Sequence, residues 1–277
     1  MIRSVAFQGE RGAYSEIAAL KYFGRNIAPA PSLTFDSVFE KIKNHEVSYG
    51  IIPVENSLYG IVFETYDLLL KYSLAITGEI NLKINHYLLA KQELQPGKIK
   101  KIYSHPQALG QCSNYLKKLK NLEIVPAYDT AGSAKIVKNS DEEVAAIASK
   151  EAGRIYGLKT LKNKIQNNKD NYTRFLILGN KIAHIPGKNL KSSICFELKN
   201  IPGALFKALS VFALRDIDLL KIESRPIPHK PFQYSFYVDF KGCLQEVRIK
   251  QALNHLKEIS LSLKLFGSYQ TGKTYSS

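Results

Sequence analysis

The chain has 277 residues, of which 45% are hydrophobic and 23% are charged, and its formal net charge is +15. This length exceeds that of one ordinary compact domain, so we expect two domains, or a large one with a smaller one. No stretch reaches the ~18 apolar residues of a membrane-spanning helix, and the start is too short in apolar sequence for a signal peptide. The composition therefore predicts a cytoplasmic protein with no membrane partner.

The positive charge brings nucleic-acid binding into consideration. The lysines are dispersed, however, and the densest runs, at 98–101 and 117–120, are short. Such runs more commonly form the solvated end of a helix or loop. We therefore rank nucleic acid behind an anionic small molecule as the partner.

Cysteine and histidine spacing gives no metal-binding pattern. Cys112, Cys195 and Cys243 lie far apart without a C-x-x-C pair, which a reducing compartment tolerates. The six histidines include no H-E-x-x-H pair. We expect three buried thiols and no metal.

The first 180 residues alternate between strand-like and helix-like segments. Strands are expected at 4–8, 49–54, 75–79, 84–90, 102–103, 123–126 and 145–148 and around Thr173, with helices at 15–23, 37–43 and 63–72 and after Pro106, Thr130 and Ser149. Ser37 and Glu40 have the spacing of a capping box for the second helix. This alternation favours parallel sheets covered by helices, the α/β class.

A segment without clear periodicity, around Pro186-Gly187, predicts a domain boundary. We assign residues 1–180 to one region, 181–191 to a linker and 192–277 to a second domain. In the second domain, strands are expected at 193–198, 218–224, 232–240 and 260–266, with helices around 205–212 and 249–256. The order βαββαβ is that of a ferredoxin-like unit, which commonly binds a ligand or pairs with a copy of itself.

Thr173-Arg174-Phe175 is the segment most indicative of chemistry. Arginine can hold a carboxylate through two parallel hydrogen bonds, and threonine can donate one hydrogen bond to a departing oxygen. The pair indicates an anionic substrate that loses an oxygen. Neighbours on a regular strand point to opposite faces, so Thr173 and Arg174 can share a pocket only if the strand ends or bulges there.

Glu55-Asn56-Ser57 follows a buried strand, at the place where open α/β sheets bind ligands. Glu55 can donate a proton if burial raises its pKa, while Asn56 and Ser57 can orient a substrate. Capping of the next helix explains all three residues equally well. The sequence leaves both explanations open.

Three further polar turns precede predicted helices. They contain Ser15, the Ser104-His105-Pro106-Gln107 run and Thr130. Taken singly, each is best explained as an ordinary helix cap, and His105 as a structural histidine. Together their hydroxyl and amide groups indicate a pocket for an oxygen-rich anion.

These motifs occur in a familiar order along nearly the whole chain. On Pro53-Val54-Glu55-Asn56-Ser57, Ser104-His105-Pro106-Gln107-Ala108 and Thr173-Arg174-Phe175, the sequence resembles the prephenate dehydratases. The tail resembles their regulatory ACT domain, with Gly203-Ala204-Leu205-Phe206 and Glu223-Ser224-Arg225-Pro226 as the signature stretches.

The resemblance implies two α/β lobes similar to type II periplasmic binding proteins, with the active site in their cleft, followed by an ACT domain. It implies conversion of prephenate to phenylpyruvate, water and carbon dioxide in phenylalanine biosynthesis. No cofactor is expected, because aromatisation of the ring drives the reaction. The resemblance also implies feedback inhibition by L-phenylalanine and a homodimer or homotetramer.

The resemblance also assigns roles to residues. Thr173 would help the hydroxide to depart as a hydrogen-bond donor, Arg174 would bind a substrate carboxylate, and Phe175 would pack against them. The other expected substrate-binding residues are Glu55, Asn56, Ser57, Ser15 and Thr130. The expected L-phenylalanine site consists of Asn200, Pro202, Gly203, Ala204, Leu205, Glu223, Ser224 and Arg225.

Two alternative functions stay open. Arogenate dehydratase acts on a substrate with an amine in place of the ketone, and no residue excludes it. A non-catalytic amino-acid sensor is a second alternative, against which Thr173-Arg174 and Glu55-Asn56-Ser57 argue. An intersubunit ion pair also explains Glu223-Ser224-Arg225 nearly as well as effector binding. We expect a monofunctional chain, with no room for a chorismate mutase helix bundle before Val5.

Overall fold

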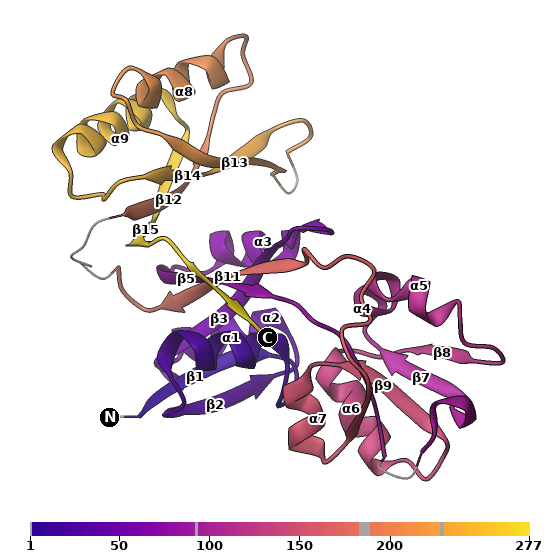
Figure 1. Ribbon diagram of the computed structural model, residues 1–277. Helices are drawn as coiled ribbons and strands as arrows, with labels where there is room; N and C mark the ends of the chain where they lie inside the picture. Colours follow the sequence, from indigo (N-terminus) through magenta and orange to yellow (C-terminus); the bar gives the residue numbers. More distant parts are fainter. Residues whose placement is uncertain (1, 92–93, 183–188, 228–229) are drawn as a thin grey trace. The chain divides into compact units, whose positions relative to one another are not determined.

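The computed structural model of the chain describes all residues except 1, 92–93, 183–188 and 228–229 (Figure 1). The described residues form two units. The first contains the residues up to Ser73, Ile80–Ile177 and Lys273–Ser277, and the second contains Leu74–Glu79 and Leu178–Gly272. Most of the predicted linker, at 183–188, lies outside the described residues. The division at residues 180 and 192 stays a prediction.

A seven-stranded sheet forms the first lobe, and its strands β5 and β11 each continue from one unit into the other. The strands are β1 (Arg3–Gln8), β2 (Ile27–Ser32), β3 (Tyr49–Asn56), β4 (Gly60–Ile61), β5 (Ala75–Lys83), β11 (Tyr172–Gly179) and β16 (Lys273–Ser276). Their order is β16-β5-β11-β3-β1-β2, with β4 beside β3. The helices of this lobe are α1 (Tyr14–Phe23), α2 (Phe35–Lys43) and α3 (Phe63–Lys71).

A five-stranded mixed sheet forms the second lobe of the first unit. Its strands are β6 (Tyr87–Ala90), β7 (Lys101–Ser104), β8 (Glu123–Pro126), β9 (Val144–Ala148) and β10 (Lys159–Lys162), in the order β10-β6-β9-β7-β8. Its helices are η1 (Pro96–Lys98), α4 (Pro106–Gln111), α5 (Ser113–Leu116), α6 (Thr130–Asn139) and α7 (Lys150–Tyr156). One buried cluster joins Phe7 and Phe175 of the first sheet to Leu89 and Ala146 of the second, so the two lobes share a core.

The second unit contains the predicted βαββαβ fold. Its elements are β12 (Leu190–Glu197), α8 (Ala204–Ala213), β13 (Leu219–Pro226), β14 (Tyr234–Lys241), α9 (Val247–Ile259) and β15 (Ser262–Gln270). The antiparallel sheet has the order β13-β14-β12-β15, and Phe196 and Phe240 of the sheet pack with Phe212 and Leu256 of the helices. The α/β class with a ferredoxin-like C-terminal unit is confirmed.

Four strands of the structure were not expected from the sequence: β2, β4, β10 and β16. β2 contains Pro29 and Pro31, which usually argue against a strand, but β2 lies at the edge of its sheet and pairs only with β1. The predicted capping box was also wrong. Thr34 is the N-cap of α2 and forms the box with Ser37, which is already helical.

Candidate active site

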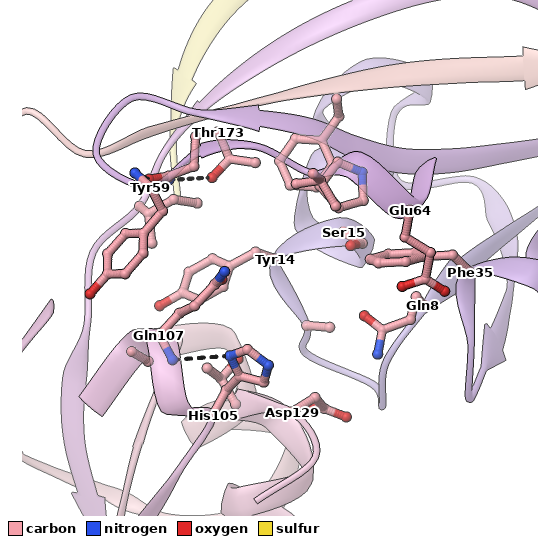
Figure 2. Close-up of a pocket in the computed structure, with 18 of the residues that line it drawn as sticks. Gln8, Tyr14, Ser15, Phe35, Tyr59, Glu64, His105, Gln107, Asp129 and Thr173 are labelled. Atoms are coloured by element: carbon pink, nitrogen blue, oxygen red, sulfur yellow. Dashed lines mark hydrogen bonds between the residues drawn. The ribbon is translucent and has the colours of Figure 1, made fainter. Parts of the chain in front are cut away.

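A pocket with a volume of about 520 Å³ lies in the first unit, and both of its lobes contribute to the lining (Figure 2). Asn56 and Thr173 come from the first sheet, and His105 and Asp129 precede helices of the second lobe. Asn56 and His105 both stand at the carboxyl ends of strands. Ligands of open α/β sheets bind at this edge.

Five helices begin at the pocket. The lining residues Tyr14, Phe35, Val62, His105 and Thr130 stand at, or directly before, the first residue of α1, α2, α3, α4 and α6. A helix N-terminus has unpaired N–H groups and a partial positive charge. Thr34 caps α2 and Asp129 caps α6, whereas no side chain caps α1 or α3. The pocket is therefore suited to an anion.

The described lining contains no lysine or arginine, and its acidic residues are Glu64 and Asp129. Asp129 is buried, and this burial raises its pKa. Its carboxylate accepts backbone N–H bonds from Gly132 at 2.7 Å and from Glu10 at 3.2 Å. An anion in this pocket would depend on helix N-termini and hydroxyl groups for its stabilisation.

Thr173 is the second residue of β11, and Asn56 fixes the orientation of its hydroxyl. Nδ2 of Asn56 donates to Oγ1 of Thr173 at 3.0 Å (Figure 2). Oδ1 of Asn56 accepts the backbone N–H groups of Leu58 and Tyr59, at 3.0 and 3.1 Å, so the amide has only one possible orientation. Because Oγ1 accepts a bond from Asn56, the Thr173 proton is available to donate to a ligand.

A series of hydrogen-bonded polar groups continues from Asn56 to His86 and Tyr14, which also line the pocket. Nδ2 of Asn56 also donates to Oδ1 of Asn171 at 2.8 Å, and Nδ2 of Asn171 donates to Oε1 of Gln111 at 2.9 Å. Oε1 of Gln111 lies 2.6 Å from Nε2 of His86, whose Nδ1 lies 2.9 Å from the Tyr14 hydroxyl. Burial lowers the pKa of His86 to about 4, so its imidazole is neutral at pH 7.

The structure brings some of the predicted substrate-binding residues together. Ser15, Asn56, Thr130, Thr173 and Phe175 line the pocket, whereas Glu55, Ser57 and Arg174 are not among its lining residues. Two of these positions differ from the expected helix caps: the N-cap of α1 is Ala13, so Ser15 lies in the first turn and does not cap it. Thr130 is likewise the first residue of α6, after the cap Asp129.

Arg174 follows the alternation of a regular strand. Thr173 and Phe175 line the pocket, and Arg174 lies between them in sequence, with its Nη1 3.8 Å from Oε2 of Glu55. Ser57 instead ties the end of β3 to β11, since its Oγ accepts the backbone N–H of Tyr172 at 2.9 Å. The roles assigned to these residues in substrate binding stay predictions.

Several lining residues were not predicted as site residues, among them Gln8, Tyr14, Glu64, His86, Gln107, Gln111 and Asp129. Gln107 and Gln111 are four residues apart and therefore on one face of α4, which is a signal that the sequence did contain. His105 is a cap as expected, since its Nδ1 accepts the N–H of Gln107 at 3.3 Å (Figure 2). His86 follows β5 in an irregular segment that has no recognisable motif.

The residues predicted to bind L-phenylalanine lie in the second unit. Asn200, Pro202 and Gly203 precede α8, Ala204 and Leu205 begin it, and Glu223, Ser224 and Arg225 belong to β13. Gly203 is the N-cap of α8 with φ of 78°, a conformation that favours glycine, and no side chain caps this helix. Effector binding at these residues stays a prediction.

Within the described ranges, no group of three or more histidine, cysteine, aspartate or glutamate residues is placed to hold a metal ion. No helix in the same ranges has the length and apolar character needed to cross a membrane.

Comparisons with known proteins identify relatives of this chain by sequence and by fold. The family model described as prephenate dehydratase matches residues 5–183. Arogenate dehydratase/prephenate dehydratase 2 of Arabidopsis thaliana is 44% identical over 282 residues, which cover 98% of this chain and 73% of that protein. The solved prephenate dehydratase of Arthrobacter aurescens, in complex with L-Phe, is 29% identical with a TM-score of 0.89, over 97% of this chain and 90% of that one.

A solved structure described as the quorum quenching acylase GqqA is also 29% identical with a TM-score of 0.89, over 98% of both chains. The shared fold therefore does not by itself specify one reaction. The match of the family model over more than half of the chain and the 44% identity to the Arabidopsis protein do specify the family. The chain belongs to the prephenate dehydratase family of enzymes.

Proposed function

We propose that this enzyme converts prephenate to phenylpyruvate, water and carbon dioxide. The observation that carries the proposal is the hydroxyl of Thr173, which Asn56 orients to donate into a pocket where five helices begin. Membership of the prephenate dehydratase family supports the same reaction.

The reaction needs little from the protein beyond positioning and stabilisation of charge. As the ring loses carbon dioxide, the electron pair of that carbon–carbon bond completes the aromatic ring and expels the ring hydroxyl as hydroxide. The hydroxide then takes up one proton to become water. Threonine is too weak an acid to supply that proton outright, so Thr173 acts as a hydrogen-bond donor to the departing oxygen, and the proton comes from solvent.

The two carboxylates of prephenate require stabilisation in a pocket without lysine or arginine in its described lining. We assign one of them to the uncapped N-terminus of α1, beside Ser15, and include Thr130 as a second hydroxyl donor. Phe175 packs against the ring. Arg174 is not among the lining residues, so the role proposed for it is stabilisation of the substrate carboxylates by its positive charge at longer range, although Glu55, 3.8 Å away, offsets part of that charge.

Arogenate is the second candidate substrate. It carries an ammonium group where prephenate has a ketone, and the carboxylates of Glu64 and Asp129 line the same pocket. An ammonium group close to either carboxylate would be attracted to it. The printed name of the Arabidopsis relative includes both activities.

Turnover of the two substrates tests the proposal. The wild-type enzyme is incubated with prephenate and, separately, with arogenate, and phenylpyruvate and phenylalanine are measured. We expect Thr173→Ala to lower kcat by about 100-fold or more, as loss of a donor to a developing oxyanion does, and Thr173→Ser to keep most of it. No turnover of either substrate would exclude the proposal. Equal losses in the two variants would show that the methyl group matters instead of the hydroxyl.

We also propose that L-phenylalanine binds the second unit and inhibits the enzyme. Support comes from the uncapped start of α8 at Gly203, where amide groups can hold a carboxylate, and from the Arthrobacter relative solved with L-Phe. Calorimetry should show binding of L-phenylalanine but not of D-phenylalanine, with weaker binding in Glu223→Gln. Absence of both binding and inhibition would contradict this part.

A homodimer or homotetramer is the assembly we propose. Phe206, Leu214 and Val247 of the second unit are each more than 70% exposed, and exposed apolar surface often marks an interface. Light scattering of the full chain would give its mass in solution. A monomer at assay concentration would exclude this assembly.

A further inference from the structure

We propose that His86 is a positioning residue for the reaction: its neutral imidazole, protonated on Nε2, holds the amide groups of Gln111, Asn171 and Asn56, which orient the hydroxyl of Thr173. The inference rests on the proposed function, because it explains how the leaving-group donor is held. His86 was not a predicted site residue; it is 2% exposed and lines the pocket.

The direction of every hydrogen bond in this series follows from two backbone groups. The N–H groups of Leu58 and Tyr59 can only donate, so the atom of Asn56 that faces them is its oxygen. The nitrogen of the Asn56 amide therefore faces Asn171 and Thr173. This orientation requires an acceptor on Asn171, so Oδ1 of Asn171 points to Asn56 and its Nδ2 points away.

The same argument continues to the histidine. Nδ2 of Asn171 donates to Gln111, so the Gln111 atom at this junction is its oxygen. That oxygen lies 2.6 Å from Nε2 of His86, which must therefore carry a proton. In a neutral imidazole Nδ1 is then an acceptor, and the Tyr14 hydroxyl at 2.9 Å can donate to it. The Tyr14 hydroxyl also lies 2.6 Å from the backbone oxygen of Asn85, so its proton has two acceptors.

Because the middle of this series is buried, its hydrogen bonds depend on the proton on Nε2 of His86. Asn171 is fully buried and Gln111 is 9% exposed, so neither amide can readily exchange a lost partner for water. If Nε2 of His86 lost its proton, two acceptors would face each other. A rotation of the Gln111 amide to relieve this would place two donors opposite each other at Asn171. Either arrangement releases Asn56 from its fixed position and lets the Thr173 hydroxyl turn.

The backbone around His86 is held independently of its ring. The N–H of His86 donates to Oε1 of Gln166 at 3.0 Å, and the oxygen of His86 accepts the N–H of Ile165 at 2.9 Å. Replacement of the side chain therefore leaves the local chain path supported. This makes substitutions at His86 a fair test of the imidazole itself.

The first test compares two substitutions in two backgrounds. His86→Gln can place an amide donor near the position of Nε2, whereas His86→Asn is too short to reach Gln111. We expect His86→Asn to lower kcat about 10- to 100-fold with little change in KM, and His86→Gln to recover part of the loss. In a Thr173→Ala background, His86→Asn should cause no further loss, because the group that it positions is absent. An equal loss of kcat in both backgrounds would overturn the proposal.

The second test is independent of turnover. The ¹⁵N chemical shifts of the His86 ring in the wild-type protein should show a proton on Nε2 and none on Nδ1 at neutral pH. A proton on Nδ1 would overturn the proposal even if both His86 variants were poorly active. If the wild-type enzyme turned over neither prephenate nor arogenate, the proposed function would fail, and these spectra would still decide the state of His86.

Discussion

The amide of Asn56 orients the hydroxyl of Thr173. An isosteric substitution can keep the acceptor end of this amide and remove its donor end. In Asn56→Asp, the carboxylate still accepts the N–H groups of Leu58 and Tyr59, but an acceptor replaces the donor that faces both Thr173 and Asn171. The Thr173 proton would then bond to the new carboxylate instead of the departing oxygen. We expect kcat to fall about 100-fold, measured by steady-state kinetics with prephenate.

The control for this variant is its thermal unfolding, because the new carboxylate also faces the oxygen of the buried Asn171 and can lower stability. A midpoint close to that of the wild type would assign the loss to the donor. An unchanged kcat would mean that the orientation of Thr173 does not limit the reaction.

The buried imidazole of His86 also makes stability depend on pH. Burial lowers the pKa of His86 from 6.5 to about 4. Between these pH values the imidazole is protonated in the unfolded chain but stays neutral in the folded chain. The free energy of unfolding is therefore unaffected by this titration above pH 6.5 and decreases as the pH drops towards 4. At 1.36 kcal/mol per pKa unit, the shift corresponds to a loss of about 3 kcal/mol.

Urea unfolding at pH 7 and pH 4.5 measures this effect when the wild type is compared with His86→Gln. The carboxyl groups of the protein titrate in both proteins and cancel in the comparison, and burial keeps the pKa of Tyr14 far above this range. The wild type should lose more free energy of unfolding than the variant. Equal losses would exclude His86 as a source of acid sensitivity.

At the scale of elements, the features that could be predicted from the sequence are those that depend on residues close together in the chain. The alternation of apolar residues in β14 and the polar turn after β3 were visible in the sequence, and Thr173 and Asn56, which it singled out, line the candidate pocket. β16 was not, because Lys273–Ser276 is polar and becomes a strand only by pairing with Ile80–Lys83, far away in sequence. His86, Gln111 and Asn171 escaped prediction for the same reason, since three separate segments bring them together.

The loop between β1 and α1 shows how tightly one of these elements is placed. Gly12 has φ of +88°, and a Cβ there would lie 2.6 Å from Cα of Ala152, a backbone atom that cannot move aside cheaply. Oγ of Ser149 also donates to the oxygen of Gly12 at 2.7 Å. Gly12→Ala should therefore displace the start of α1 from α7, cost about 2 to 4 kcal/mol of stability and lower kcat/KM.

Gly24→Ala is the matched control, because Gly24 has φ of +86° and no neighbour within 4 Å of its would-be Cβ. Both variants carry backbone strain, but only Gly12→Ala adds the collision with Ala152. Thermal unfolding and steady-state kinetics should show the larger effect for Gly12→Ala. Equal effects would mean that backbone strain alone accounts for the loss.

At the scale of the whole molecule, β5 begins in the second unit and ends in the first. Its residue Glu79 forms an ion pair with Lys191 of β12, and the side chains are only 3% and 7% exposed. Oε1 of Glu79 also accepts the N–H of Gly272, at 3.0 Å, just before the chain enters β16. This pair thus fixes the second unit to one of the strands that the two units share.

Removing one charge of this pair should lower the free energy of unfolding far more than removing both. Glu79→Gln keeps an acceptor for Gly272 but removes the negative charge beside the buried Lys191 ammonium, and Lys191→Met removes the positive charge beside the buried Glu79 carboxylate. We expect each to lower the free energy of unfolding by about 3 to 5 kcal/mol, and the double variant to lie much closer to the wild type. Calorimetric unfolding of the four proteins gives the coupling energy between the two residues. If the double variant lost the sum of the two single losses, the charges would not be coupled, and the attachment of β5 to the second unit would depend on its backbone and apolar contacts alone.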